Sequence, residues 1–151
     1  PMAMLPFCGY NMADYFAHWL AQGGRAGAVL PKIFQVNWFR QDENGKYMWP
    51  GFGQNLRVLQ WIVDRARGRG AVVETPVGFL PDPKAIDTTG LGVSEESMRD
   101  LLAIDTEAWL AEMEEEAAFF GLFGSRLPEE LRREMSSQEK RLESANAKGG
   151  R

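Results

Sequence analysis

The sequence predicts an α+β fold in which helices surround one hairpin and a few short β segments. Five segments carry apolar residues at helical spacing, and turn residues separate shorter runs that favour strands. Hydrophobic residues make up 44% of the 151 residues and charged residues 25%, which is typical of a chain that buries a core. One hairpin with ragged β segments makes a poor sheet, so we expect these strands to join a larger sheet of a longer protein.

The first predicted helix spans residues 11–22. Met12, Phe16 and Trp19 lie among apolar residues spaced three or four apart, which gives the helix one apolar face. Asn11 is a suitable N-cap, and Gly23-Gly24 is a suitable end for the helix.

A hairpin and a second helix follow. A strand is predicted over residues 33–39, where alternate side chains face the same way. Asp42-Glu43-Asn44-Gly45 is predicted to turn the chain, because Asn-Gly tolerates positive φ, and residues 46–49 form a short return run. Residues 55–67 have helical periodicity that ends at Gly68.

The remainder of the chain predicts short β segments, a loop and three helices. Residues 71–80 favour short β segments, which Pro76 interrupts, so edge or irregular pairing is expected. Residues 81–93 carry the prolines, glycines and polar residues of a loop. The expected helices begin at Ser94, run from Asp105 to about Phe123, and run from Leu127 to Ala145, and residues 147–151 should fray.

Charge and composition exclude several classes of function. The net charge is −4, which argues against nucleic-acid binding, because that needs a basic surface. One cysteine and one histidine exclude a disulfide within the chain and the common zinc sites. Every apolar run is shorter than the roughly 18 residues of a membrane-spanning helix. The start, Pro1-Met2-Ala3, has no signal-peptide pattern and no initiator methionine before it, so we expect a segment of a longer protein.

Aromatic residues are concentrated in one short segment. Five of them lie within residues 38–52, although aromatic residues make up 11% of the chain. Aromatic faces can sandwich a purine base, and the following helix N-terminus beside the Asn55 carbonyl could distinguish guanine from adenine. The alternative is that these rings form the core of the hairpin, and composition alone does not decide between the two.

The other chemically suggestive residues favour structural roles. His18 has no second ligand beside it, Cys8 has no basic neighbour, and the acidic run of residues 112–116 suits a solvated helix face. Arg65, Arg67 and Arg69 suit a helix C-terminus. The sequence contains no G-x-x-x-x-G-K-[ST] run, so a nucleotide bound here would have its phosphates held by another segment.

Three ordered blocks of the sequence resemble a known family. They are Pro6-Phe7-Cys8-Gly9-Tyr10-Asn11, Pro31-Lys32-Ile33-Phe34-Gln35-Val36-Asn37-Trp38-Phe39-Arg40 and Trp49-Pro50-Gly51-Phe52-Gly53-Gln54-Asn55. They closely resemble the C-terminal part of the GTP-dependent phosphoenolpyruvate carboxykinases. The resemblance covers roughly residues 6–125, and shorter matches continue through Arg57-Val58-Leu59-Gln60-Trp61, Thr75-Pro76-Val77-Gly78 and Gly90-Leu91-Gly92.

The resemblance implies a fold context and a reaction. Residues 1–125 would belong to a mixed α/β nucleotide-binding lobe, with the guanine-pocket hairpin at about residues 32–55, and residues 126–151 would form a C-terminal helix and tail. The family converts oxaloacetate and GTP to phosphoenolpyruvate, CO₂ and GDP in gluconeogenesis. It uses Mn²⁺ at the catalytic centre and Mg²⁺ with GTP, and its members are typically cytoplasmic monomers.

The resemblance also implies which residues bind guanine: Phe39, Tyr47, Phe52, Gly53, Gln54 and Asn55. Tyr47 stands where some members carry phenylalanine, and Gln54 stands where glutamate is common. No catalytic or metal-binding residue is expected in this chain, so the chain alone should be inactive. The alternative hypothesis is a stand-alone module that grips a peptide or single-stranded RNA with the aromatic hairpin.

Overall fold

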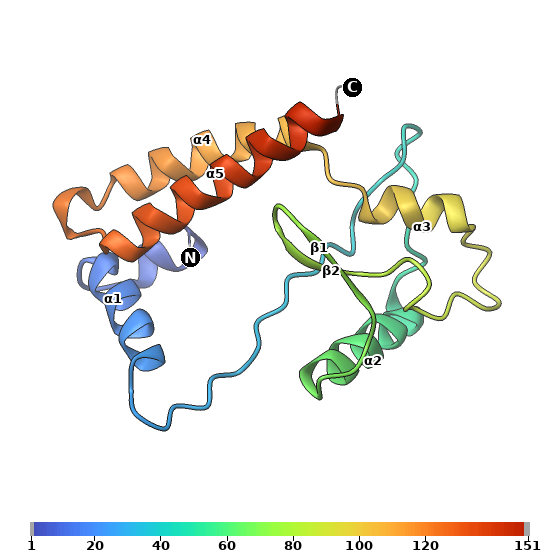
Figure 1. Ribbon diagram of the computed structural model, residues 1–151, viewed down its shortest axis with the longest axis horizontal. Coiled ribbons are helices and arrows are strands. Elements are labelled where there is room, and N and C mark those ends of the chain that lie inside the picture. The colour runs from blue at the N-terminus through green and yellow to red at the C-terminus, as the bar shows by residue number, and fades with distance from the viewer. Residues whose placement is uncertain (1, 150–151) are drawn as a thin grey trace. The chain divides into compact units, whose positions relative to one another are not determined.

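The computed structural model describes residues 2–149, with side chains described for residues 3–147 (Figure 1). The described residues form five α-helices, three short 3-10 helices and one two-stranded sheet. Helices together with a small sheet make an α+β chain, as the sequence predicts. The chain divides into two compact units, one made of residues 1–31 with 105–151 and the other of residues 32–104.

The unit made of residues 1–31 and 105–151 is helical. Its α-helices are α1 (Met12–Gly23), α4 (Thr106–Gly121) and α5 (Glu129–Gly149), and its 3-10 helices are Met2–Phe7 and Gly124–Arg126. Helix α4 packs against α5. Met12, Phe16, Phe123 and Leu127 are buried together, and the rings of Phe16 and Phe123 meet edge to face with centroids 5.4 Å apart. The apolar face predicted for residues 11–22 therefore becomes core.

Capping side chains begin three of the helices, and two of these caps, Asn11 and Ser94, are predicted from the sequence. Asn11 Oδ1 accepts a hydrogen bond from the Ala13 N–H at 2.9 Å, and Asp105 Oδ1 accepts one from the Ala108 N–H at 3.0 Å. Ser94 Oγ accepts the Ser97 N–H at 3.0 Å and begins α3 (Glu95–Leu102). Helix α5 continues through Gly149, because residues 146–148 include no helix breaker. The rest of the predicted tail, residues 150–151, lies outside the described residues.

The unit made of residues 32–104 combines helices and the sheet. Its elements are the 3-10 helix Phe52–Gln54, α2 (Asn55–Ala66), β1 (Val72–Thr75), β2 (Gly78–Pro81) and α3. Its core contains Trp49, Trp61, Ile86 and Met98, and we call these residues the tryptophan core. The second predicted helix is confirmed almost to the residue, because Arg67 forms its C-cap and Gly68 follows with a φ of 80°.

The predicted β segments around Pro76 are confirmed. Strands β1 and β2 pair antiparallel, with Val72 opposite Pro81 and Thr75 opposite Gly78. Pro76 lies in the turn between them, where its lack of a backbone N–H removes no hydrogen bond from the strand pair. The pairing is therefore a regular hairpin rather than an irregular edge.

The strand predicted over residues 33–39 is wrong, although the turn after it is correct. Residues 31–37 have no regular structure, and Gln41 with Tyr47 forms only an isolated bridge. Alternation alone does not make a strand, because a strand also needs a neighbour to accept and donate its backbone hydrogen bonds. The turn forms because Asp42 Oδ1 accepts the N–H groups of Asn44 and Lys46, at 2.9 and 3.0 Å, and Gly45 takes a φ of 74°.

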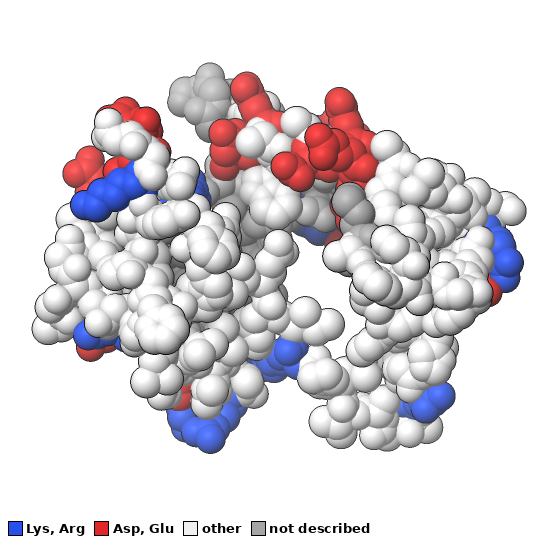
Figure 2. Space-filling view, turned by 180° about the vertical axis from the view of Figure 1, so that it is seen from behind, with Lys and Arg blue, Asp and Glu red and all other residues white. Residues whose placement is uncertain are grey.

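Acidic side chains gather over the α4–α5 hairpin (Figure 2). Glu112 and Glu114 to Glu116 are all exposed, whereas Met113 is buried. The prediction of a solvated acidic face is confirmed. No helix within residues 2–149 combines the length and the apolar composition that crossing a bilayer requires.

Candidate functional site

Phe39 and Tyr47 present their rings on the hairpin of residues 39–47. Their ring centroids lie 6.1 Å apart with the planes at 64°, an edge contact that leaves both rings accessible. Phe39 is 72% exposed and Tyr47 54% exposed. These two rings are therefore not core, whereas Trp49 of the same aromatic segment is buried in the tryptophan core, as the core alternative predicts for it. The hairpin brings them together because the Asp42–Gly45 turn sets its two arms opposite one another.

Phe52 occupies an unusual position directly after the hairpin. Gly51 and Phe52 both take positive φ, 77° and 31°, and Phe52 is the only non-glycine residue among the described residues to do so. The Phe52 side chain is 97% exposed. A bulky residue in this region of φ is strained, and its ring gains nothing from burial in return.

Asn55 begins α2, and its amide has a partner inside the protein. Asn55 Oδ1 accepts a hydrogen bond from the indole Nε1 of Trp49 at 3.0 Å. The backbone N–H of Asn55 donates to the Phe52 carbonyl, which joins the 3-10 turn to the helix. The sequence hypothesis assigned the Asn55 carbonyl to a ligand, whereas here that oxygen accepts from Trp49.

Gln54 is held by an arginine one turn further along α2. Arg57 Nε donates to Gln54 Oε1 at 2.9 Å, and Arg57 Nη1 lies 2.9 Å from the Asp87 carbonyl oxygen and 3.1 Å from its Oδ2. Hydrogen bonds from Thr89, together with the positive charge of Arg57, hold the pKa of Asp87 below its usual value. Arg57 thus links the turn before α2 to the loop that precedes α3.

A cavity of about 420 Å³ lies along α2. Among the described residues, its lining includes Gly53 and Gln54 but none of the three aromatic rings of the candidate site. The structure therefore pairs Phe39 with Tyr47, ties Asn55 to Trp49, and places Gly53 and Gln54 at this cavity. Because the described lining of this cavity contains none of Phe39, Tyr47, Trp49 and Asn55, the three groups do not form one enclosed pocket.

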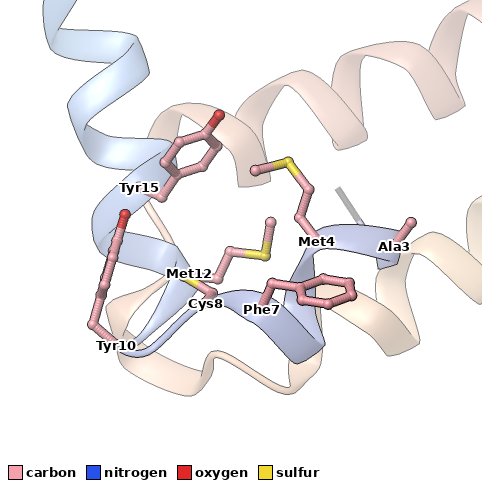
Figure 3. Close-up of a pocket in the computed structure, with 7 residues that line it drawn as sticks. All are labelled: Ala3, Met4, Phe7, Cys8, Tyr10, Met12 and Tyr15. Atoms are coloured by element: carbon pink, nitrogen blue, oxygen red, sulfur yellow. The ribbon is translucent and has the colours of Figure 1, made fainter.

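A second cavity, of about 280 Å³, lies in the other unit and involves none of these residues. Figure 3 shows Met12 near its centre, with Tyr10 and Tyr15 to one side and Met4 and Phe7 to the other. Cys8 is half-buried and packs against the Met12–Phe16 cluster, so the predicted packed thiol is confirmed. His18 is exposed on α1, where its Nε2 lies 3.1 Å from Gln22 Nε2.

No metal site can be assembled from the residues described. Within residues 2–149, no group of three or more His, Cys, Asp or Glu side chains is placed to hold an ion. Two basic residues at the end of α2 and just beyond it have structural partners: the Arg65 guanidinium lies 5.5 Å from the centre of the Phe79 ring, and Arg69 pairs with Asp64.

Comparison with known proteins places the chain in a family. Residues 1–141 match the family model for the phosphoenolpyruvate carboxykinase C-terminal P-loop domain. This match covers the whole of one compact unit, most of the other, and every residue of the candidate site.

Several curated relatives support the same assignment. The chain is 50% identical over 143 residues to the phosphoenolpyruvate carboxykinase [GTP] of Chlamydia muridarum, covering 94% of this chain and 24% of the relative. It is 50% identical over 147 residues to the protein of the same name from Neocallimastix frontalis, covering 96% and 24%. The Treponema pallidum protein is 48% identical over 144 residues, covering 94% and 23%. The chain spans about a quarter of the length of these relatives, and it belongs to the GTP-dependent phosphoenolpyruvate carboxykinase family.

Proposed function

We propose that this chain supplies the guanine-binding part of a GTP-dependent phosphoenolpyruvate carboxykinase. The whole protein would convert oxaloacetate and GTP to phosphoenolpyruvate, CO₂ and GDP, and would act in the cytoplasm as a monomer. Family membership supports this proposal, because the relatives are named for this GTP-dependent activity. The same similarity gives no support to a stand-alone module for peptide or single-stranded RNA.

The proposed lobe boundaries follow the resemblance. Residues 1–125 would form part of the nucleotide-binding lobe, and residues 126–151 would form its C-terminal helix and tail. Mn²⁺ and Mg²⁺ would supply charge that stabilises the transferring phosphoryl group. The described residues do not fit either ion, so other parts of the protein would hold them. The chain alone would therefore not turn over oxaloacetate.

The base-binding site is proposed at Phe39, Tyr47, Phe52, Gly53, Gln54 and Asn55. Phe52 is the observation that carries this proposal, because strained backbone and a solvent-exposed ring together suit a residue kept for binding rather than packing. The rings of Phe39, Tyr47 and Phe52 would stack on the base, and stacking contributes roughly 1–3 kcal/mol per base. Gly53 lets the backbone approach a flat ligand closely, and Asn55 would contact the base edge.

Photolabelling tests where the base binds. We expect a guanine nucleotide with an azide on its base to label peptides within residues 32–55 of the purified protein. GDP should compete with the label, and ADP should compete poorly, since a guanine site distinguishes the two base edges. Labelling that maps to residues 105–149 would contradict the proposal, as would labelling that ADP suppresses as well as GDP does.

A further inference from the structure

We propose that Trp49 is a positioning residue that fixes which end of the Asn55 amide faces the nucleotide base. This inference rests on the proposed function, because it concerns how the same site distinguishes guanine from adenine. It assigns a specificity role to a residue that the family resemblance does not place in the guanine pocket.

Trp49 is well placed to hold a neighbouring side chain still. Its side chain is 6% exposed and packs in the tryptophan core beside Trp61. From there its indole Nε1 lies 3.0 Å from Asn55 Oδ1. The Pro50-Gly51 turn and the 3-10 turn of residues 52–54 separate the two residues in sequence, so the hydrogen bond closes the short loop that carries Phe52.

The direction of this hydrogen bond follows from chemistry. An indole N–H can only donate, so the atom it meets must be the carbonyl oxygen of Asn55 and not the amide nitrogen. Without such a partner, rotation about the broad, roughly two-fold χ2 torsion exchanges the oxygen and nitrogen ends of an asparagine amide. Asn55 is half-buried, so the amide N–H₂ end that Trp49 does not engage remains able to serve a ligand.

This orientation favours guanine over adenine. Guanine presents the O6 acceptor where adenine presents an amino donor, and both bases share the N7 acceptor. An N–H₂ group directed at position 6 can donate a hydrogen bond to guanine O6. It cannot do so to adenine, because adenine has an amino group there, which is also a donor. Hypoxanthine also carries O6, so IDP should be recognised at this contact as well as GDP is.

Trp61 provides a matched control inside the same core. Its side chain is 7% exposed, and its indole Nε1 donates to the Ala71 carbonyl at 3.2 Å. Replacement of either tryptophan by phenylalanine removes one indole ring and one hydrogen bond from the tryptophan core. Only Trp49→Phe also releases the Asn55 amide.

The test measures dissociation constants of the purified protein for GDP, IDP and ADP. Trp49→Phe should reduce the preference for GDP over ADP by about fivefold, the equivalent of one hydrogen bond, and leave the GDP-to-IDP ratio unchanged. Trp61→Phe should lower the unfolding midpoint comparably and leave both ratios unchanged. In the Asn55→Ala background, Trp49→Phe should cause no further loss of preference.

Asn55→Asp tests the same idea with Trp49 intact, should Trp49→Phe fail to fold. The carboxylate still accepts the indole N–H but offers no N–H₂ group, so the preference for GDP over ADP should fall. An unchanged preference in Trp49→Phe or Asn55→Asp would overturn the inference, and so would an equal loss in Trp61→Phe. A wild-type protein with no preference for GDP would instead contradict the proposed function itself.

Discussion

Phe52 combines two unfavourable features, and neither is expected to persist in a protein unless a function retains it. Its φ of 31° lies where side chains with a Cβ atom are strained, and its ring is almost fully in solvent. A Cβ built on the preceding Gly51, at a φ of 77°, would meet no atom within 4 Å, so that glycine is required by its backbone conformation and not by lack of space. Binding of an aromatic ligand would account for both observations.

Comparison of Phe52→Gly with Phe52→Ala separates the effect of backbone strain at this position from the effect of losing the aromatic ring. Both variants lose the stacking ring, so both should bind GDP about 5- to 150-fold more weakly. Glycine normally destabilises a site relative to alanine by about 0.5–1 kcal/mol, but positive φ should reverse that order here. Chemical denaturation measures the free energy of unfolding of the two variants. An alanine variant more stable than the glycine variant would contradict the strain at this position.

At the scale of elements, local signals predicted the helices and failed for one strand. Asn11, Ser94 and Asp105 each accept a hydrogen bond from an N–H two or three residues later. The local sequence is therefore enough to predict where these helices begin. The alternation of residues 33–39 is equally clear, but no neighbouring strand pairs with it among the described residues. Strand formation depends on partners distant in sequence, and no local pattern reports them.

The end of helix α2 depends on a carboxylate. The Asp64 side chain accepts hydrogen bonds from Arg69 and from Gln60, and its backbone carbonyl accepts the Arg69 N–H at 2.8 Å. The hydrogen bond from Arg69, followed by that from Gln60, lowers the pKa of Asp64 below its ordinary value. The pair thus joins the last turn of α2 to the Gly68–Gly70 loop.

Asp64→Asn should show how this contact depends on pH. A carboxyl whose pKa is lowered by folding stabilises the protein above its unfolded pKa, and that contribution disappears as pH falls through the folded pKa. The variant should therefore be less stable than wild type at neutral pH, and the difference should shrink below about pH 4. Denaturation midpoints measured across this range provide the check, with Glu112→Gln on the exposed face of α4 as control. A difference that stays constant down to pH 2 would exclude the ionised pair as its source.

For the whole molecule, the resemblance implies which residues make up the candidate site, but it does not say how those residues contact one another. The resemblance implies Phe39, Tyr47, Phe52 and Asn55, and all three rings are exposed in the structure. The Trp49–Asn55 hydrogen bond was not predicted, because it depends on burial of Trp49 against residues as distant as Met98. The one feature of the sequence that could have indicated this bond is Trp49, whose indole can only donate, six residues before Asn55 and across the Pro50-Gly51 turn.

We propose that this chain, which spans about a quarter of the length of the carboxykinases it matches, carries a guanine site. Equilibrium titration of the purified protein with GDP and with ADP tests it most directly. GDP should bind at least about tenfold more tightly than ADP, and Asn55→Ala should remove most of that difference. Equal affinities for the two nucleotides, or tighter binding of ADP, would contradict the claim.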